Sequence, residues 1–425
     1  MKRIAKSLLS LLALITLFSC AQERENWPQW RGPDANGIAT PGNYPVNFSA
    51  TDDALWTVAL PGRGASTPAV WGDHIILTSV VGEGSDGEDG VLCYDWDGDL
   101  IWQTTIGPMR RGGRQPRGTP SNPSPVTDGE RIFVFFHSST VAALDFDGNV
   151  LWSKNLIEEY GEIYYFFDIG TSPVLVKDNV LIAVMHEGDS YLLALNQATG
   201  DVAWKVERNY TSGRETPQSY TTPIVIDENG RKTIVVWGAD HLTGHDAATG
   251  EMIWEYGGFN PSQRAAWRTI ASAVYYDGAV LVPYGRGMFT AAVRTGLTGN
   301  MDEEDFIWQI SRVGSDVATP VITMGVAYIL AFNGNLWGID MESGEELWQT
   351  RLEGAVGTFY ASPTMAGNKL YMVCDQGSFF VVEVSRESAE IVHQTKFEDN
   401  IVATPVLLRD RLIVRGTDYL YVFGE

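Results

Sequence analysis

The sequence predicts an all-β protein, an eight-bladed β-propeller of four-stranded antiparallel blades, and three observations support this fold class. A Ser/Thr-Pro pair or its equivalent recurs eight times, at steps of 42 to 57 residues. A tryptophan recurs seven times in one frame of the same repeat. Tight acidic or glycine turns precede most of these tryptophans. Repeats of this length, each with several short strands, are typical of propeller blades.

The repeat is clearest between Thr221 and Trp254. Four strands are expected there, and they are Ile224–Ile226, Thr233–Val236, Leu242–Asp246 and Met252–Trp254. The Ala-Thr-Gly turn before the last strand fits a hairpin, because glycine adopts the positive φ that such turns require.

The other repeats follow the same order of elements. The eight openings are Thr67-Pro68, Ser124-Pro125, Ser172-Pro173, Thr222-Pro223, Ser272-Ala273, Thr319-Pro320, Ser362-Pro363 and Thr404-Pro405. The closing positions are Trp56, Trp102, Trp152, Trp204, Trp254, Trp308 and Trp348, with His393 in the same frame.

The two ends of the repeat array complement one another. The first closing strand, Ala54 to Leu60, comes before any opening, whereas the last unit, Thr404 to Phe423, has no closing strand after it. The N-terminal strand is therefore expected to complete the last blade, which leaves the ring without an unpaired end. The propeller is predicted to span residues 54–425.

The N-terminus has the layout of an export signal. Lys2, Arg3 and Lys6 precede an apolar run from Leu8 to Phe18 that is too short to cross a bilayer. The residues around Cys20 resemble a bacterial lipobox. That resemblance implies a signal peptide over residues 1–19, a lipid anchor on Cys20 and an outer-membrane lipoprotein that faces the periplasm or the cell surface. A plain secretory peptide is the alternative.

Residues 20–53 form a preamble rich in Gly and Pro that contains Trp27-Pro28-Gln29-Trp30-Arg31-Gly32-Pro33. Two interpretations stay open for it. It packs on the propeller and covers the closing joint, or it is an arm that binds a partner. Its composition argues against a separate helical domain.

Charge and cysteine content narrow the range of partners. Without the signal peptide, 27 basic residues stand against 53 acidic ones, which gives a net charge of −26 and argues against nucleic acid as a partner. Cys93 and Cys374 fall in the first and seventh units, so two buried free thiols are expected rather than a disulfide. We expect a monomer.

The repeat resembles a known family. Leu193 to Trp204 has the pattern L-A-L-x-x-x-T-G-x-x-x-W, and this and the Thr-Pro openings are similar to the quinoprotein (PQQ-like) propeller repeats over residues 54–423. One branch of that superfamily consists of dehydrogenases that hold pyrroloquinoline quinone and calcium, with a disulfide of adjacent cysteines stacked on the quinone. Another branch includes the lipid-anchored propeller subunit of the outer-membrane barrel-assembly machine, a scaffold without a cofactor. This sequence has no adjacent cysteine pair and no C-x-x-C-H haem motif, so the resemblance favours the second branch, with no cofactor. Fold likeness alone does not carry an activity.

A recognition surface is predicted where the long loops gather. In an antiparallel four-stranded blade, the connections between blades and those between the second and third strands emerge on one face of the ring. That face, the long-loop face, is expected to carry eleven of the 22 arginines and no lysine. The arginines are Arg63, Arg110, Arg111, Arg114, Arg117, Arg208, Arg214, Arg264, Arg268, Arg286 and Arg312.

Arginine suits carboxylate and phosphate groups and stacks on aromatic rings. The hypothesis is a funnel that binds an anionic or sugar-like ligand, or an acidic peptide. Its proposed ligand-binding residues are Arg110, Arg111, Arg114, Arg117, Tyr165, Arg214, Arg264, Trp267, Arg268 and Arg286. In the alternative interpretation, these arginines pair with loop carboxylates such as Glu215 and hold the loops in place.

Signals for catalysis and metal binding are weak. His241 and His245 are four residues apart, but on a strand and turn, so the spacing does not indicate zinc. Asp168 and Asp316 are expected to face the funnel, yet no oriented histidine accompanies them in the sequence, and no catalytic residue is assigned.

Three functions follow. The first and favoured one is a non-enzymatic, lipid-anchored envelope propeller that binds a protein partner or ligand. The second is a quinone-dependent oxidoreductase that uses PQQ and calcium. The third is a carbohydrate-binding or carbohydrate-active propeller.

Overall fold

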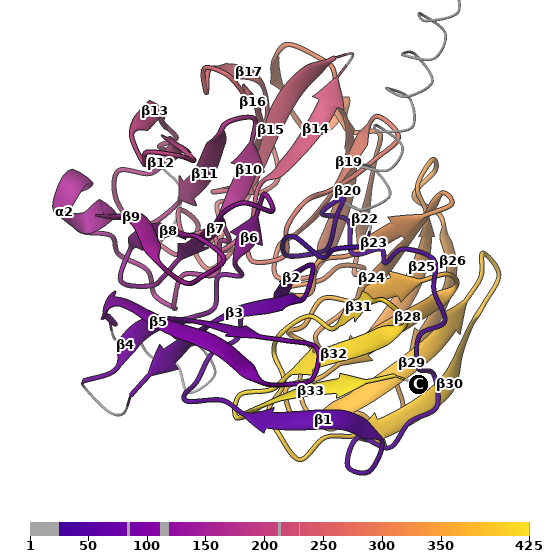
Figure 1. Ribbon diagram of the computed structural model, residues 1–425. Helices are drawn as coiled ribbons and strands as arrows, with labels where there is room; N and C mark the ends of the chain where they lie inside the picture. The colour runs from indigo at the N-terminus through magenta and orange to yellow at the C-terminus, as the bar shows by residue number, and fades with distance from the viewer. Residues whose placement is uncertain (1–24, 83–85, 111–118, 211–213, 229, 425) are drawn as a thin grey trace, which may run out of the picture.

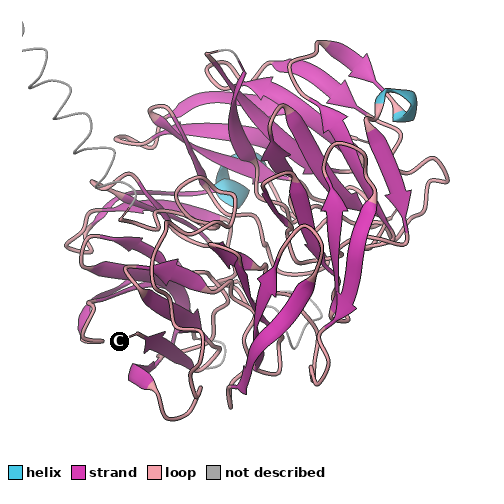
Figure 2. Cartoon of the chain, turned by 90° about the vertical axis from the view of Figure 1, so that its right-hand side faces the viewer, coloured by secondary structure: helices cyan, strands magenta, loops and turns pink. Residues whose placement is uncertain are grey.

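The computed structural model describes residues 25–82, 86–110, 119–210, 214–228 and 230–424. These residues form eight sheets arranged as a ring, and all their strand pairs are antiparallel except one in blade 4 (Figure 1). Strands account for nearly all of the regular structure (Figure 2). The eight-bladed propeller predicted from the repeats is therefore confirmed.

Each blade runs from an inner strand at the channel to an outer strand at the rim. Blade 1 holds β2 (Ala69–Trp71), β3 (His74–Val81), β4 (Glu88–Tyr94) and β5 (Leu100–Pro108). Blade 2 holds β6 (Val126–Thr127), β7 (Ile132–Phe135), β8 (Thr140–Leu144) and β9 (Val150–Asn155), followed by α2 (Leu156–Tyr160). Blade 3 holds β10 (Val174–Val176), β11 (Asn179–Val184), β12 (Tyr191–Asn196) and β13 (Val202–Glu207). Blade 4 holds β14 (Ile224–Glu228), β15 (Arg231–Gly238), β16 (His241–Asp246) and β17 (Met252–Tyr256).

The second half of the ring repeats this order with one insertion. Blade 5 holds β18 (Val274–Tyr276), β19 (Ala279–Tyr284), β20 (Phe289–Arg294) and β22 (Trp308–Ser311). Between β20 and β22 lie β21 (Gly299–Met301), which pairs in parallel with β17 of blade 4, and the short helix η1 (Glu303–Asp305). Blade 6 holds β23 (Val321–Thr323), β24 (Val326–Leu330), β25 (Asn335–Asp340) and β26 (Glu346–Arg351). Blade 7 holds β27 (Thr364–Ala366), β28 (Lys369–Val373), β29 (Ser378–Val384) and β30 (Ala389–Lys396). Blade 8 holds β31 (Val406–Leu408), β32 (Arg411–Arg415), β33 (Tyr419–Phe423) and the N-terminal β1 (Ala54–Ala59).

The N-terminal strand closes the ring as the sequence predicts. β1 pairs antiparallel with β33, with Thr57 opposite Tyr421 and Val58 opposite Leu420. The first and last strands of the propeller thus share one sheet, and neither end of the repeat array is left unpaired.

The repeated tryptophans and glycines join neighbouring blades. Each such glycine has a positive φ in the turn between the third and fourth strands, and the Cβ that it lacks would stand 2.5 to 2.8 Å from a tryptophan ring of the preceding blade. A side chain at these positions would collide with the ring, so the turn chemistry and the blade packing require the same residue. The pairs are Trp56 with Gly98, Trp102 with Gly148, Trp152 with Gly200, Trp204 with Gly250, and Trp308 with Gly344.

The preamble crosses the face of the ring that carries the tight turns. Its first part runs beside blade 1, where Trp27 is fully buried and exchanges backbone hydrogen bonds of 2.7 and 2.8 Å with Val70. Ile38 then forms a parallel bridge with Met365 in blade 7. The crossing ends at Phe48, whose ring centroid lies 5.2 Å from that of His393. His393 occupies the position that a tryptophan occupies in the other seven repeats.

Cys93 and Cys374 are both buried free thiols. Within the ranges given above, no helix has the length and apolar character needed to cross a membrane. Cys20 and the expected signal peptide lie outside the described residues.

Candidate functional site

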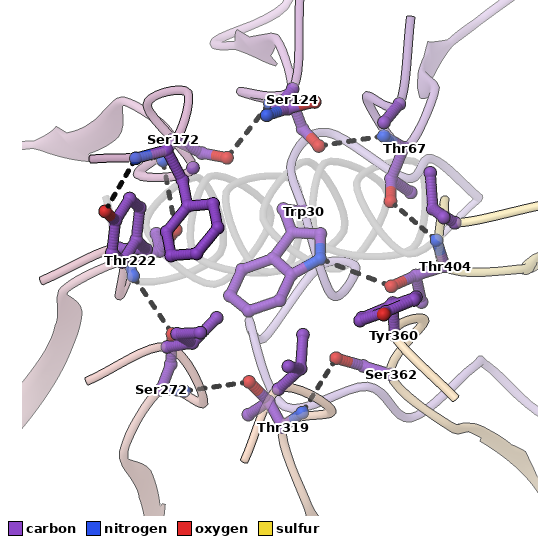
Figure 3. A pocket seen from close by; sticks show the side chains of 18 of the residues that line it. Trp30, Thr67, Ser124, Ser172, Thr222, Ser272, Thr319, Tyr360, Ser362 and Thr404 are labelled. Atoms are coloured by element: carbon purple, nitrogen blue, oxygen red, sulfur yellow. Dashed lines mark hydrogen bonds between the residues drawn. The ribbon is translucent and has the colours of Figure 1, made fainter. Parts of the chain in front are cut away.

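The channel of the propeller is lined by one hydroxyl residue from each blade. In seven of the eight steps around the ring, the backbone N–H of one such residue donates to the side-chain oxygen of the next, at 2.9 to 3.1 Å (Figure 3). We call this set the hydroxyl ring, and its members are Thr67, Ser124, Ser172, Thr222, Ser272, Thr319, Ser362 and Thr404. The Ser and Thr of the repeated openings therefore tie adjacent blades together at the channel wall.

The eighth step of the hydroxyl ring differs from the others. Among the described residues, Ser362 N–H makes no hydrogen bond to Thr404. Instead, the indole N–H of Trp30 donates to Thr404 Oγ1 at 3.4 Å. Trp30 lies at the centre of the hydroxyl ring and is seen face-on in Figure 3. The preamble thus inserts an aromatic side chain into the channel.

Arg31 holds Trp30 in this position. The Arg31 side chain is buried and donates to the backbone carbonyl oxygens of Thr319 at 3.0 Å, Asn36 at 2.7 Å and Pro320 at 2.5 Å. Burial lowers the pKa of Arg31 to about 9, which still leaves the guanidinium charged at neutral pH. A buried guanidinium must keep its hydrogen-bond acceptors, so Arg31 ties the preamble to the backbone of the propeller at Thr319 and Pro320.

Trp30 forms the floor of a cavity of about 480 Å³ that we call the funnel. Its walls come from the connections between blades and from the loops between second and third strands, which is the long-loop face expected from the sequence. Above the hydroxyl ring, the aromatic residues of the wall are Phe167, Tyr220, Phe332 and Tyr360.

The funnel wall carries two carboxyl groups. Burial raises the pKa of Asp168 to about 6, and its buried Oδ1 has no hydrogen-bond partner among the residues that the structure describes. Burial also raises the pKa of Asp316, against the opposing effect of Arg268 and Arg286. Both carboxyl groups line the funnel.

A buried histidine, His137, lies near the Asp168 carboxyl group without a hydrogen bond to it. Ile169 N–H donates to His137 Nδ1 at 3.1 Å, so the Nε2 atom of the neutral ring carries the proton. That Nε2 lies 3.8 Å from Asp168 Oδ1, which is longer than a hydrogen bond. Burial lowers the pKa of His137 to about 4, so the imidazole is neutral at physiological pH.

Two of the ten predicted ligand-binding residues line the funnel. Arg268 pairs with Glu215 at 2.8 Å, and its guanidinium lies 4.6 Å above the ring of Phe167. The Nε of Arg268 is buried and has no hydrogen-bond partner in the described part of the chain. Arg286 is 4.0 Å from Asp316 and its side chain is 43% exposed. Both arginines therefore contact loop carboxylates, as the alternative interpretation predicts, and both also line the funnel.

Two further predicted residues belong to a second cavity, of about 320 Å³, at the side of blade 5. Arg264 lies 5.5 Å from the ring centroid of Trp267, and Trp267 packs against Tyr284 and Phe289. Arg264 is exposed.

The remaining predicted residues are dispersed. The Tyr165 hydroxyl accepts a hydrogen bond from Met185 N–H at 3.0 Å, and Tyr165 does not line the funnel. Arg110 pairs with Glu162 at 3.2 Å. Arg214 is exposed. Arg111, Arg114 and Arg117 lie outside the described residues.

Sequence reasoning missed Trp30 and the hydroxyl ring as parts of the site. The signal was present in both cases, because the Ser/Thr of the openings recur once per blade and Trp30 stands in the densest aromatic run of the preamble. The repeat pattern marks the openings, but it does not show that their side chains line the channel.

Fold and site together define a closed eight-bladed propeller with a plugged channel and one open funnel. The family described as outer membrane protein assembly factor BamB, a PQQ-like repeat family, matches residues 46–229, 218–383 and 338–423. The chain belongs to this family.

Individual relatives agree with that membership. The outer membrane protein assembly factor BamB of Escherichia coli (strain K12) is 24% identical over 321 residues, which are 71% of this chain and 73% of the relative. The protein of the same name from Moranella endobia (strain PCIT) is 24% identical over 330 residues, 74% of this chain and 76% of the relative.

Solved structures show the shared fold. BamB from Moraxella catarrhalis superposes with a TM-score of 0.61 at 13% identity, covering 88% of this chain and 97% of that one. A europium-containing methanol dehydrogenase superposes with a TM-score of 0.70 at 12% identity, covering 96% of this chain and 99% of the dehydrogenase chain. Because an assembly factor and a dehydrogenase both match, the likeness to solved structures speaks for the fold alone.

Proposed function

We propose that the protein is a non-enzymatic, lipid-anchored scaffold of the bacterial envelope that acts in the assembly of outer-membrane proteins. The match to the family across all eight blades and the relatives named outer membrane protein assembly factor support this function. In this proposal the chain is a monomer held at the outer membrane by a lipid on Cys20, and its partner is an envelope protein.

The two faces of the propeller differ, and this difference indicates which face binds the partner. The preamble crosses the turn face from Val70 to His393, whereas the long-loop face keeps an open funnel and a second cavity. Exposed Arg264 and Arg214 stand on that second face, and an arginine beside an aromatic ring is a frequent anchor in protein interfaces. We therefore place the partner on the long-loop face.

A quinone-dependent activity is the alternative, and the residues of the site do not fit it. Among the described residues, no group of three His, Cys, Asp or Glu side chains is arranged to hold a metal ion such as calcium. Cys93 and Cys374 are buried in different blades, so they cannot form a disulfide of adjacent cysteines. The centre of the channel is taken by Trp30. These observations support a scaffold without a cofactor.

Site-specific photocrosslinking in intact cells tests the scaffold and its face together. A photoreactive phenylalanine analogue replaces Arg264 on the long-loop face, and the matched control carries it at Met324, which is 74% exposed in a turn of the opposite face. We expect the Arg264 variant to crosslink to a component of the outer-membrane assembly machinery, identified by mass spectrometry, and the Met324 variant not to. Equal crosslinking from both positions, or crosslinking only from Met324, contradicts the assignment of the face.

Two further measurements test the remaining parts of the proposal. Cys20→Ser should move the protein from the membrane fraction to the soluble envelope fraction. Addition of pyrroloquinoline quinone and calcium to the purified protein should produce neither a bound quinone absorbance nor dye-linked alcohol oxidation. Either signal would overturn the non-enzymatic assignment.

A further inference from the structure

The hydroxyl ring offers unused hydrogen-bond donors to the funnel. Every oxygen in the hydroxyl ring accepts one hydrogen bond, seven from backbone N–H groups and that of Thr404 from the indole of Trp30. Within the described part of the chain, none of the eight O–H groups finds an acceptor, although each hydroxyl can donate one hydrogen bond. The channel wall is thus a circle of neutral donors around an aromatic floor.

Higher in the funnel, one buried acceptor and one buried donor lack hydrogen-bond partners within the described ranges. Asp168 is 6% exposed, and its Oδ1 is an unpartnered acceptor. The side chain of Arg268 is 11% exposed, and its Nε is an unpartnered donor. A buried polar atom without a partner costs free energy that a matching ligand recovers, so these two atoms indicate a ligand that both donates and accepts.

The charges in the funnel balance. Arg268 and Arg286 stand against Asp168 and Asp316, all four of which line the cavity. A strongly anionic ligand would meet two carboxyl groups as well as two guanidinium groups, which removes the electrostatic advantage that an anion site needs. A neutral ligand has no such conflict.

The aromatic side chains that line the funnel favour a ligand that also has an apolar face. The Trp30 indole closes the bottom of the funnel, and Phe167, Phe332 and Tyr360 stand around it (Figure 3 shows Trp30 and Tyr360). A pyranose ring presents an apolar C–H face together with hydroxyl groups that donate and accept, which matches an aromatic floor within a circle of hydroxyls. The volume of about 480 Å³ is within the range of small-molecule sites.

From these observations we propose that the funnel binds the end of a neutral oligosaccharide, with one pyranose ring against Trp30. Because Trp30 closes the channel, the site takes the end of a sugar chain and does not let a chain pass through. The Asp168 carboxyl group and the Arg268 Nε bind sugar hydroxyls as acceptor and donor. This inference goes beyond the scaffold function and does not depend on it.

The test is binding of three neutral probes, maltotriose, cellobiose and N,N′-diacetylchitobiose, to the full purified chain. Saturation-transfer NMR and indole fluorescence titration report the contact and the affinity. At least one probe is expected to bind, and Phe332→Ala and Asp168→Asn are each expected to weaken it about tenfold or more. Phe332 is 49% exposed, so its removal leaves the fold intact. Met324→Ala on the opposite face is the matched control and should leave the affinity unchanged.

Three results would overturn the proposal. The first is that none of the three probes binds. The second is that inorganic phosphate or citrate binds more tightly than every sugar, which would make the funnel an anion site. The third is that Trp267→Ala abolishes sugar binding while Phe332→Ala and Asp168→Asn leave it unchanged, which would place the sugar in the cavity beside blade 5.

Discussion

Replacing Asp89 by asparagine should stabilise the protein at neutral and alkaline pH but not at acidic pH. Asp89 lies in β4 and is 1% exposed. Ser138 is near its carboxyl group and only partly offsets the cost of burying it. Burial raises its pKa from 3.8 to about 7. The ionised form is therefore disfavoured in the folded protein, and the protonated form is nearly the same shape as asparagine.

The sign and size of the effect follow from proton linkage. A carboxyl group with a raised folded pKa binds more protons in the folded than in the unfolded state between pH 3.8 and about 7. The free energy of unfolding falls as the pH rises through that window and is constant above it. A pKa displaced from 3.8 to about 7 corresponds to roughly 4 kcal/mol, at about 1.4 kcal/mol for each pH unit. The wild-type protein should lose this amount across the window, and Asp89→Asn should not.

Urea unfolding between about pH 4 and pH 9 measures the difference, followed by both tryptophan fluorescence and circular dichroism so that two-state behaviour is checked. The variant and the wild type should have similar stability at the acidic end and diverge by several kcal/mol at the alkaline end. Asp97→Asn, at an exposed turn position, is the control and should give a flat difference. Parallel curves for Asp89→Asn and wild type across the whole range would refute the reasoning.

Two other substitutions test how the blades and the preamble are held. Gly200→Ala should cost about 2–3 kcal/mol in urea unfolding, because the new Cβ meets Trp152 at 2.7 Å, whereas Gly278→Ala, with a similar φ and nothing within 4 Å, should cost about 1 kcal/mol. Equal costs would show that backbone strain alone matters. Arg31→Met keeps the length of the side chain but leaves the Thr319 carbonyl without its donor, so limited proteolysis within residues 25–53 should become faster. An unchanged cleavage rate would mean that Arg31 does not hold the preamble.

The fold was predictable because its determinants are local and repeated. The closing Trp152 and the turn glycine Gly200 recur in register once per blade, and the structure shows that they contact each other across the blade interface. Ring closure by β1 followed from counting closing strands. In contrast, β21 carries no repeat signal, since it arises from an insertion that pairs with the edge of the preceding blade.

The site was less predictable because a sequence gives the face on which a residue lies but not its distance from the channel. Arg264 and Arg268 are four residues apart in one loop, yet Arg268 lines the funnel while Arg264 lies beside the outer cavity. The charge of an arginine does not show whether it already has a partner, and several of these arginines have local ones. Arg208, for example, is buried and donates to the carbonyl oxygens of Gly238 and His241. Trp30 lies in a segment without periodicity, so its aromatic surroundings single it out in the sequence but do not place it in the channel.

The N-terminal segment contributes to both the site and the fold. Residues 25–53 supply the floor of the funnel through Trp30, and they lead directly into β1, which closes the ring. A ligand that rests on Trp30 binds only the state in which the preamble is docked. By mass action such a ligand stabilises that state, by about 2.7 kcal/mol at a hundredfold excess over its Kd. Occupancy of the funnel and attachment of the preamble are therefore coupled, and a funnel ligand should slow proteolysis within residues 25–53 in the wild type more than in Arg31→Met.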